Sequence, residues 1–222
     1  TRYRSSAASD VYKRQDMEGQ LKVGCIPTIA PFLLCELVQE VNYRFPQLNL
    51  LLREDTTTNL LQALRHGELD VLILALPVEI EGMESRVVGQ DPFRMVISAN
   101  QADSVPVPIR YADLPDESAF LLEEEHCLTE HAVSACKLTD KEKINPFTAT
   151  SLHTLVQMVA NGLGTTFIPQ MAIDHGLLHN QNLVVIDPPG QQAYRDIGLV
   201  WRPSSSRSNT FNQLAEVVSE LL

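Results

Sequence analysis

Residues 69–76 place the strongest limit on the fold, because all eight are apolar except Asp70. A strand whose two faces are both covered shows such a run, whereas a half-exposed strand alternates apolar and polar residues. Two shorter apolar stretches, 21–26 and 48–53, come before it, and each leads into a segment with helical spacing, 31–45 and 59–66. This β-α-β-α-β order predicts an α/β fold with a doubly wound, mainly parallel sheet and right-handed crossovers.

A second set of elements follows Pro92 and predicts a second lobe. We expect two Rossmann-like lobes, with lobe I formed by residues 19–91 and 196–222 and lobe II by residues 92–195. In sheets of this kind, ligands bind beyond the carboxyl ends of the strands. The strands and helices expected after Pro92 are 93–98, 119–122, 152–160 (a helix capped by Thr150-Ser151), 165–168, 183–186, 197–201 and 211–222 (a helix).

The charge of the chain argues against DNA binding by these lobes. Residues 16–222 hold 13 Lys and Arg against 27 Asp and Glu, whereas phosphate binding depends on clustered Lys and Arg. Residues 1–18 show no useful periodicity, and we expect a disordered leader or tag there. Because no secretory signal or 18-residue apolar span is present, we expect no membrane contact and a reducing, cytoplasmic location.

Cys127 and Cys136 bound the stretch that we call the cysteine segment, residues 127–136. If this segment is the helix that its sequence predicts, the two thiols lie on opposite faces and about 13 Å apart along the axis. A disulfide requires Cα atoms about 4.4–6.8 Å apart, so the bond could form only if the segment unwound. Such a pair suggests a redox switch, and the alternative is that both thiols merely fill space in the interior.

Other polar residues fall where predicted strands lead into predicted helices. Thr28, the run Thr56-Thr57-Thr58 and Cys127 all lie at such turns, so they are candidates for one shared cleft. The alternative is that the threonines cap helices. The two other cysteines, Cys25 in a strand and Cys35 on a helix with an apolar stripe, are expected to be inert packing residues.

Two further kinds of site are weaker explanations of the same residues. A zinc site could use His126, Cys127, His131 and Cys136, but zinc sites usually include a C-x2-C pair, so we expect no metal and no cofactor. A thiol peroxidase is disfavoured because the chain has no C-x-x-C motif and no thioredoxin-like pattern.

Several motifs together resemble the regulatory domains of LysR-type transcription regulators. Most are generic to that family, but His126-Cys127 followed by eight residues and Cys136 resembles its peroxide-sensing members specifically. The resemblance covers residues 19–222 and implies a bilobal fold like that of type 2 periplasmic binding proteins. The generic motifs are GCIPT (24–28), LDVLILAL (69–76), ATSL (149–152), MVANGLG (158–164) and IGLVWRP (197–203).

The resemblance also implies roles for individual residues in a sensor that is not a turnover enzyme. It implies Cys127 as the peroxidatic cysteine and Cys136 as the resolving one, joined by a reversible disulfide. Thr28, Thr57 and His126 match positions that line the peroxide pocket of the family, and a basic residue near that pocket matches Arg195.

The partners implied are hydrogen peroxide, a second regulatory domain in a homodimer, a homotetramer at full length, RNA polymerase, and glutaredoxin or thioredoxin as reductant. The family's N-terminal winged helix-turn-helix has no counterpart in this sequence, so we expect DNA binding only through that part. The alternative function is a LysR-type domain that binds a small metabolite, with the cysteines incidental.

Overall fold

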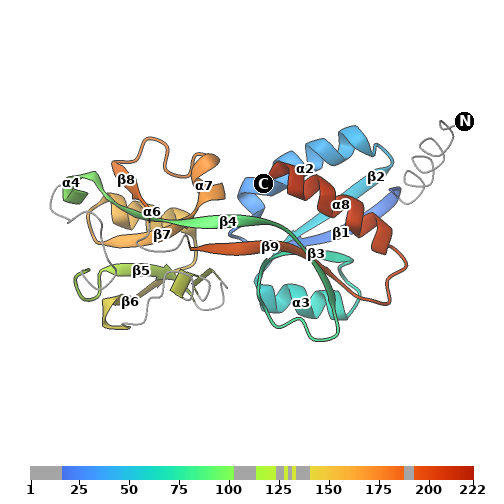
Figure 1. Cartoon of the computed structure of the whole chain (residues 1–222), viewed down its shortest axis with the longest axis horizontal. Coiled ribbons are helices and arrows are strands. Elements are labelled where there is room, and N and C mark those ends of the chain that lie inside the picture. The colour runs from blue at the N-terminus through green and yellow to red at the C-terminus, as the bar shows by residue number, and fades with distance from the viewer. Residues whose placement is uncertain (1–16, 103–113, 124–127, 130–131, 134–140, 188–192) are drawn as a thin grey trace, which may run out of the picture. The chain divides into compact units, whose positions relative to one another are not determined.

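The computed structural model describes residues 17–102, 114–123, 128–129, 132–133, 141–187 and 193–222 (Figure 1). The chain divides into two compact units: unit 1 comprises Thr1–Gly89 and Ile197–Leu222, and unit 2 comprises Gln90–Asp196. It passes from unit 1 to unit 2 within one strand and returns within another. Apart from Met17 and Glu18, the expected leader lies outside the described residues. In the part of the chain that the structure describes, no helix is long and apolar enough to cross a membrane.

Unit 1 is a sheet with the strand order β2-β1-β3-β9-β4. Strand β1 runs parallel to both β2 and β3, which confirms the predicted β-α-β-α-β arrangement. The elements of this unit are β1 (Gly19–Cys25), α2 (Ala30–Arg44), β2 (Leu48–Glu54), α3 (Thr57–Arg65), β3 (Val71–Leu76), the first part of β4 (Glu84–Ser98), the second part of β9 (Tyr194–Trp201) and α8 (Ser208–Leu221).

The core of unit 1 forms around β3. All six of its residues are buried, as its apolar run predicts, because helices cover the sheet on both faces. Helix α2 contributes Leu33, Leu37 and Val41, which recur every four residues and so form one buried stripe. Helix α8 lies beside α2 (Figure 1), and their outer surfaces are joined by an ion pair between Arg44 and Glu220 at 2.6 Å.

Unit 2 has the strand order β4-β7-β5-β6, with β8 also paired to β4. Strand β5 runs parallel to β6 and β7, whereas β4 runs antiparallel to β7 and β8. Besides the remainder of β4 and the beginning of β9, the elements of this unit are α4 (Ala99–Ala102), β5 (Ala119–Leu122), a 3-10 turn (Lys141–Lys143), β6 (Ile144–Ala149), α6 (Leu152–Ala160), β7 (Thr165–Pro169), α7 (Gln170–Asp174) and β8 (Leu183–Ile186).

The sequence did not predict β6, α7, the short elements α4 and Lys141–Lys143, or the first nine residues of β4. Pro146 lies inside β6, and a proline argues against a strand in the interior of a sheet. β6 is the outermost strand of its order, where a residue without an N–H is tolerated. The predicted cap of α6 is confirmed, because the Ser151 Oγ accepts a hydrogen bond from the Thr154 N–H at 3.3 Å.

Gly164 yields a test of packing in unit 2. A Cβ at this position would overlap the Ser118 carbonyl oxygen and lie 2.8 Å from the Phe120 ring, so backbone would have to move. We expect Gly164→Ala to lower stability by more than the roughly 1–3 kcal/mol that is typical of overpacking. Gly24→Ala is the matched control, since its Cβ would meet only the flexible ends of leucine side chains. Thermal unfolding compares the two, and equal losses would contradict this view of Gly164.

Candidate functional site

Thr28 and Thr57 lie at one edge of the unit 1 sheet. β1 and β2 are parallel neighbours whose last paired residues are Cys25 and Glu54, so their carboxyl ends meet at that edge. Thr28 follows β1 by three residues and is 3% exposed, while Thr57 is the first residue of α3 and is 8% exposed. The fold therefore brings these two predicted residues to the same edge of one sheet.

The capping explanation of the threonines is not supported at either helix. The N-cap of α2 is Ile29 and that of α3 is Thr56, and neither uses its side chain to cap the helix. Thr28 and Thr57 occupy the positions on either side of these caps. Neither Thr28 nor Thr57 is therefore the N-cap residue of its helix.

Asp55 organises the turn that carries Thr57. Its Oδ1 accepts hydrogen bonds from the Thr56 N–H at 2.9 Å and from Asn59 Nδ2 at 2.7 Å, and its Oδ2 accepts one from Arg53 Nη2 at 2.7 Å. The hydrogen bond from Asn59, followed by that from Arg53, lowers the pKa of the Asp55 carboxyl below its ordinary value. At neutral pH Asp55 is therefore a carboxylate that accepts hydrogen bonds from three groups around this turn.

In unit 2 the corresponding edge is the carboxyl end of β5. This strand ends at Leu122, and the next residue, Glu123, donates its N–H to the Ala149 carbonyl at 3.0 Å, which extends the pairing with β6. The predicted sites His126, Cys127 and Cys136 follow this strand in the sequence but lie outside the described residues, as does His131 of the zinc alternative. Among the residues that are described, no group of three or more potential ligands could hold a metal ion.

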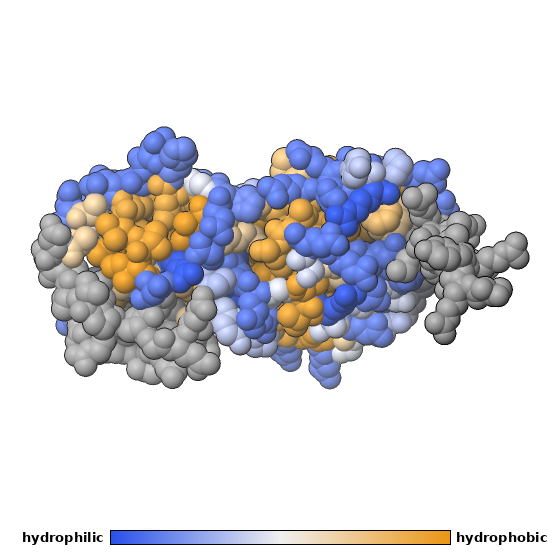
Figure 2. All heavy atoms as spheres, turned by 45° about the horizontal axis from the view of Figure 1, so that its top comes forward, coloured by the Kyte–Doolittle hydropathy of each residue, from blue (hydrophilic) through white to orange (hydrophobic). Residues whose placement is uncertain are grey.

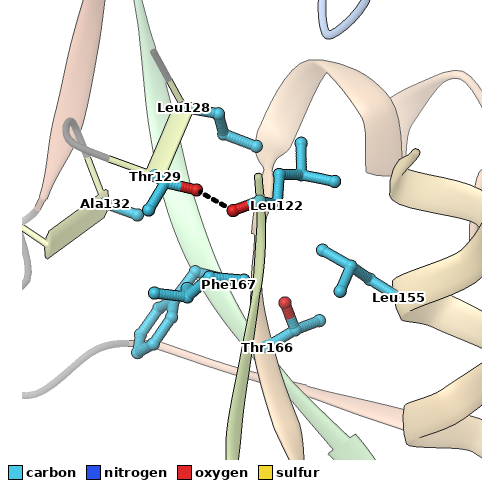
Figure 3. Close-up of a pocket in the computed structure, with 8 residues that line it drawn as sticks. Leu122, Leu128, Thr129, Ala132, Leu155, Thr166 and Phe167 are labelled. Carbon is cyan, nitrogen blue, oxygen red and sulfur yellow. Dashed lines mark hydrogen bonds between the residues drawn. The ribbon is translucent and has the colours of Figure 1, made fainter. Parts of the chain in front are cut away.

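Part of the cysteine segment is described, and it is helical. Leu128, Thr129, Ala132 and Val133 have helical backbone, as predicted for these four positions. Leu128 and Ala132 are 3% and 1% exposed and, four residues apart, share one face of the helix. They enter a small pocket (Figure 3) that is apolar apart from two threonines and is lined by Leu121, Leu122, Leu128, Thr129, Ala132, Leu155, Thr166 and Phe167.

A hydrogen bond fixes the same helical turn to the strand. The Thr129 hydroxyl donates to the Leu122 carbonyl at 2.8 Å, and Figure 3 shows the two oxygens facing each other at the end of β5. Residues 122 and 129 are thus joined in space, and Cys127 lies between them in the sequence. No sequence pattern singles out Thr129, because only the structure shows where its hydroxyl lies.

Arg195 takes part in a buried ion pair within unit 2. It is 1% exposed, and its Nε and Nη2 donate to Asp91 Oδ2 at 3.0 and 2.9 Å. Asp91 Oδ1 accepts from the Met171 N–H at 2.9 Å. The guanidinium therefore joins β9 to β4 and, through Asp91, to the start of α7. Sequence analysis named Arg195 but missed Asp91, which lies 104 residues away along the chain.

Burial confirms the prediction that Cys25 is a packing residue, whereas the same prediction for Cys35 is wrong. Cys25 is fully buried in β1, whereas Cys35 is exposed on α2 and accepts a hydrogen bond from Gln39 at 3.7 Å. Helix α2 does have an apolar stripe, but Cys35 lies about 200° around the helix from Leu33, a member of that stripe. The Cys35 thiol, which lies outside the cysteine segment, is therefore open to solvent.

Comparison with known proteins defines the class of this chain. Residues 14–222 match the LysR substrate binding domain, so the chain belongs to that family. It is also similar to OxyR2 regulatory domains from Vibrio vulnificus. The reduced form of that domain is 89% identical, with a TM-score of 0.91 over 93% of this chain and 97% of that chain. The predicted family and its bilobal α/β fold are thereby confirmed.

Curated relatives are more distant, and the chain spans about two thirds of their length. EstR from Acinetobacter baylyi is 34% identical over 93% of this chain and 68% of the relative. OxyR from Escherichia coli is also 34% identical, over 92% of this chain and 67% of the relative. Both are transcriptional regulators, and this chain is a regulatory domain of that class rather than an enzyme.

The ion pair of Arg195 yields a prediction about stability and reactivity. Asp91→Asn should lower the free energy of unfolding by about 3–5 kcal/mol, because it leaves a buried guanidinium without its carboxylate. Unfolding of Asp91→Asn, Arg195→Met and the double variant measures the coupling between the two side chains. If Arg195 supports only the fold, the folded variants should still react with peroxide at the rate of the parent chain. If Arg195→Met reacts more slowly with peroxide and Asp91→Asn does not, Arg195 instead stabilises the thiolate of Cys127.

Proposed function

We propose that this chain senses hydrogen peroxide through a reversible Cys127–Cys136 disulfide and controls a LysR-type transcriptional activator. The observation that carries the proposal is the His126-Cys127-x8-Cys136 element in a chain 89% identical to the OxyR2 regulatory domain. Similarity to the curated relatives does not by itself identify a peroxide sensor, because EstR and OxyR are equally identical to the chain.

The chemistry begins with the thiolate of Cys127. Its sulfur attacks one peroxide oxygen, the O–O bond breaks, and the departing hydroxide takes a proton to become water, leaving a sulfenic acid. The sulfur of Cys136 then attacks that of Cys127, so the S–S bond forms while the S–O bond breaks and a second water leaves. Two electrons pass from the two thiols to one peroxide, and a thiol reductant returns them.

Peroxide is proposed to bind Thr28, Thr57 and His126, with possible support from Arg195. Hydroxyl groups can hold peroxide and donate a proton to the leaving oxygen. The burial of Thr28 and Thr57 at one sheet edge supports this use. Because Arg195 donates two hydrogen bonds to Asp91, we favour a role in stabilising the fold of unit 2 over a direct contact with peroxide.

Two free-energy terms oppose the opening of the switch, the contacts that hold the helical turn and the entropy of closing the disulfide loop. Burying one leucine and one alanine and forming one hydrogen bond contribute about 3–5 kcal/mol before the entropy of ordering the segment is subtracted. A disulfide that closes a loop of about ten residues restricts the unwound segment by about 2–3 kcal/mol. Both are costs of joining the two sulfurs, and the favourable reduction of peroxide by the two thiols offsets them, so oxidation can displace the helical turn around Leu128 and Ala132.

The partners proposed are a second regulatory domain, RNA polymerase, and glutaredoxin or thioredoxin as the reductant, with a homotetramer in the full-length regulator. Association of regulatory domains is supported by apolar side chains at the surface, which Figure 2 shows in orange. Leu51 and Leu52 on the outer strand β2 are 39% and 41% exposed. The acidic composition supports DNA recognition by a separate winged helix-turn-helix part. A reversible disulfide requires a reducing compartment, which supports a cytoplasmic location.

Peptide mapping after a stoichiometric pulse of hydrogen peroxide tests the proposal. We expect a linked Cys127–Cys136 peptide within seconds, no link in Cys127→Ser, and a dimedone-trappable sulfenate in Cys136→Ser. Cys35→Ser is the background for all three, because Cys35 is exposed and can react independently. Slow, scattered oxidation of all thiols would contradict the proposal and favour a metabolite-binding domain, which a small ligand should stabilise against heat.

The two threonines of unit 1 give a separate prediction. Thr28→Val and Thr57→Val should each slow oxidation of Cys127 by about 10–100-fold without abolishing it, because they remove a group that holds or protonates peroxide. Thr58→Val is the matched control, since Thr58 belongs to the same turn but is exposed. Stopped-flow oxidation rates compare them. Unchanged rates in both buried variants would remove the threonines from the peroxide site.

A further inference from the structure

We propose that Thr129 is a positioning residue whose hydroxyl bond to the Leu122 carbonyl holds the thiol form of the sensor and thereby sets the reduction potential of the Cys127–Cys136 pair. The inference rests on the proposed function and adds to it a residue that controls how readily the disulfide forms. It starts from the 2.8 Å hydrogen bond at the end of β5 (Figure 3).

The bond closes a short loop of chain. Leu122 is the last residue of β5 and is 2% exposed, so its carbonyl is a fixed point of the sheet. Thr129 reaches back to it from the first helical turn of the cysteine segment. Cys127 lies inside the loop that this bond closes, two residues before Thr129. Release of the Thr129 hydroxyl therefore removes the link between the strand that precedes Cys127 in the sequence and the helical turn that follows it.

Burial of Leu128 and Ala132 anchors the same turn but does not make its position specific. Both side chains enter the apolar pocket, and apolar contacts are non-directional. The Thr129 hydroxyl supplies the directional contact, since a hydrogen bond weakens steeply when its geometry is lost. We infer that apolar burial holds the turn on unit 2 and that Thr129 fixes its register against the strand.

The bond belongs to the thiol form and not to the disulfide form. Leu128, Thr129, Ala132 and Val133 have helical backbone. In a helix that runs from Cys127 to Cys136, as the sequence predicts, thiols nine residues apart cannot reach the Cα separation of a disulfide. We therefore expect the turn that carries Thr129 to unwind when the sulfurs join. The Thr129 hydroxyl then exchanges the Leu122 carbonyl for water, so its bond favours the thiol side of the equilibrium.

Thr129→Val removes this bond while keeping the shape of the side chain. We expect the equilibrium for disulfide formation to shift about fivefold toward the disulfide, the effect of one ordinary net hydrogen bond. For a two-electron couple this corresponds to a reduction potential about 20 mV more negative, since tenfold is 29.6 mV. Thr129→Ser keeps the hydroxyl and should restore the parent potential.

Thr166→Val is the matched control. The Thr166 hydroxyl also donates to a carbonyl of β5, that of Phe120, at 2.8 Å, and Thr166 lines the same pocket. It lies on β7, outside the cysteine segment, so both redox forms keep its bond. We expect Thr166→Val to lower the melting temperature but leave the potential unchanged, which separates a positioning role from loss of stability in general.

The experiment is equilibration of each protein, in a Cys35→Ser background, with glutathione buffers of graded potential, followed by mass spectrometry of the Cys127–Cys136 peptide. A more negative potential in Thr129→Val alone supports the inference. An unchanged potential in a Thr129→Val protein that still forms the disulfide would overturn it and leave the proposed function intact. Failure of the parent chain to form the disulfide would overturn both. Should Thr129→Val not fold, Thr129→Ala removes the same hydroxyl and provides the measurement.

Discussion

Parallel pairing of neighbouring strands is the constraint on which the proposed site depends. Residues that follow parallel strands emerge at the same edge of the sheet, so β1 and β2 bring Thr28 and Thr57 together although 29 residues separate them in the sequence. In unit 2, the parallel pairing of β5 with β6 and β7 places the end of β5 beside Ala149 and gives the cysteine segment a rigid starting point. Without this pairing, Thr28 and Thr57 would not reach the same edge of the sheet.

A rigid strand followed by a weakly held turn is a useful combination for a redox switch. The sheet of unit 2 provides fixed acceptors, the carbonyls of Phe120 and Leu122, and threonine hydroxyls use both of them. One of these hydroxyls, that of Thr166, belongs to the core, and the other, that of Thr129, belongs to the segment that we propose unwinds on oxidation. The same kind of hydrogen bond thus stabilises the fold at Thr166 and, in our proposal, sets the reduction potential of the cysteine pair at Thr129.

Much of the fold follows from local pattern, whereas the partners of site residues do not. The apolar run of β3 and the stripe of α2 helped to predict the β-α-β-α-β part of unit 1, and the Ser151 cap located the start of α6. β6 was missed because a proline is tolerated on an outer strand that the sequence does not identify as outer. Asp91 and the acceptor of the Thr129 hydroxyl are tertiary contacts, and no periodicity reveals them.

The composition of the pocket under the cysteine segment determines which conditions can tune the sensor. Its lining in the described residues includes no charged side chain, so screening of charges by salt has no direct effect on the contacts of Leu128 and Ala132. Excluded solutes such as sucrose act differently, because they strengthen apolar burial, and cooling weakens it. The threshold for oxidation should therefore follow osmolytes and temperature more closely than ionic strength.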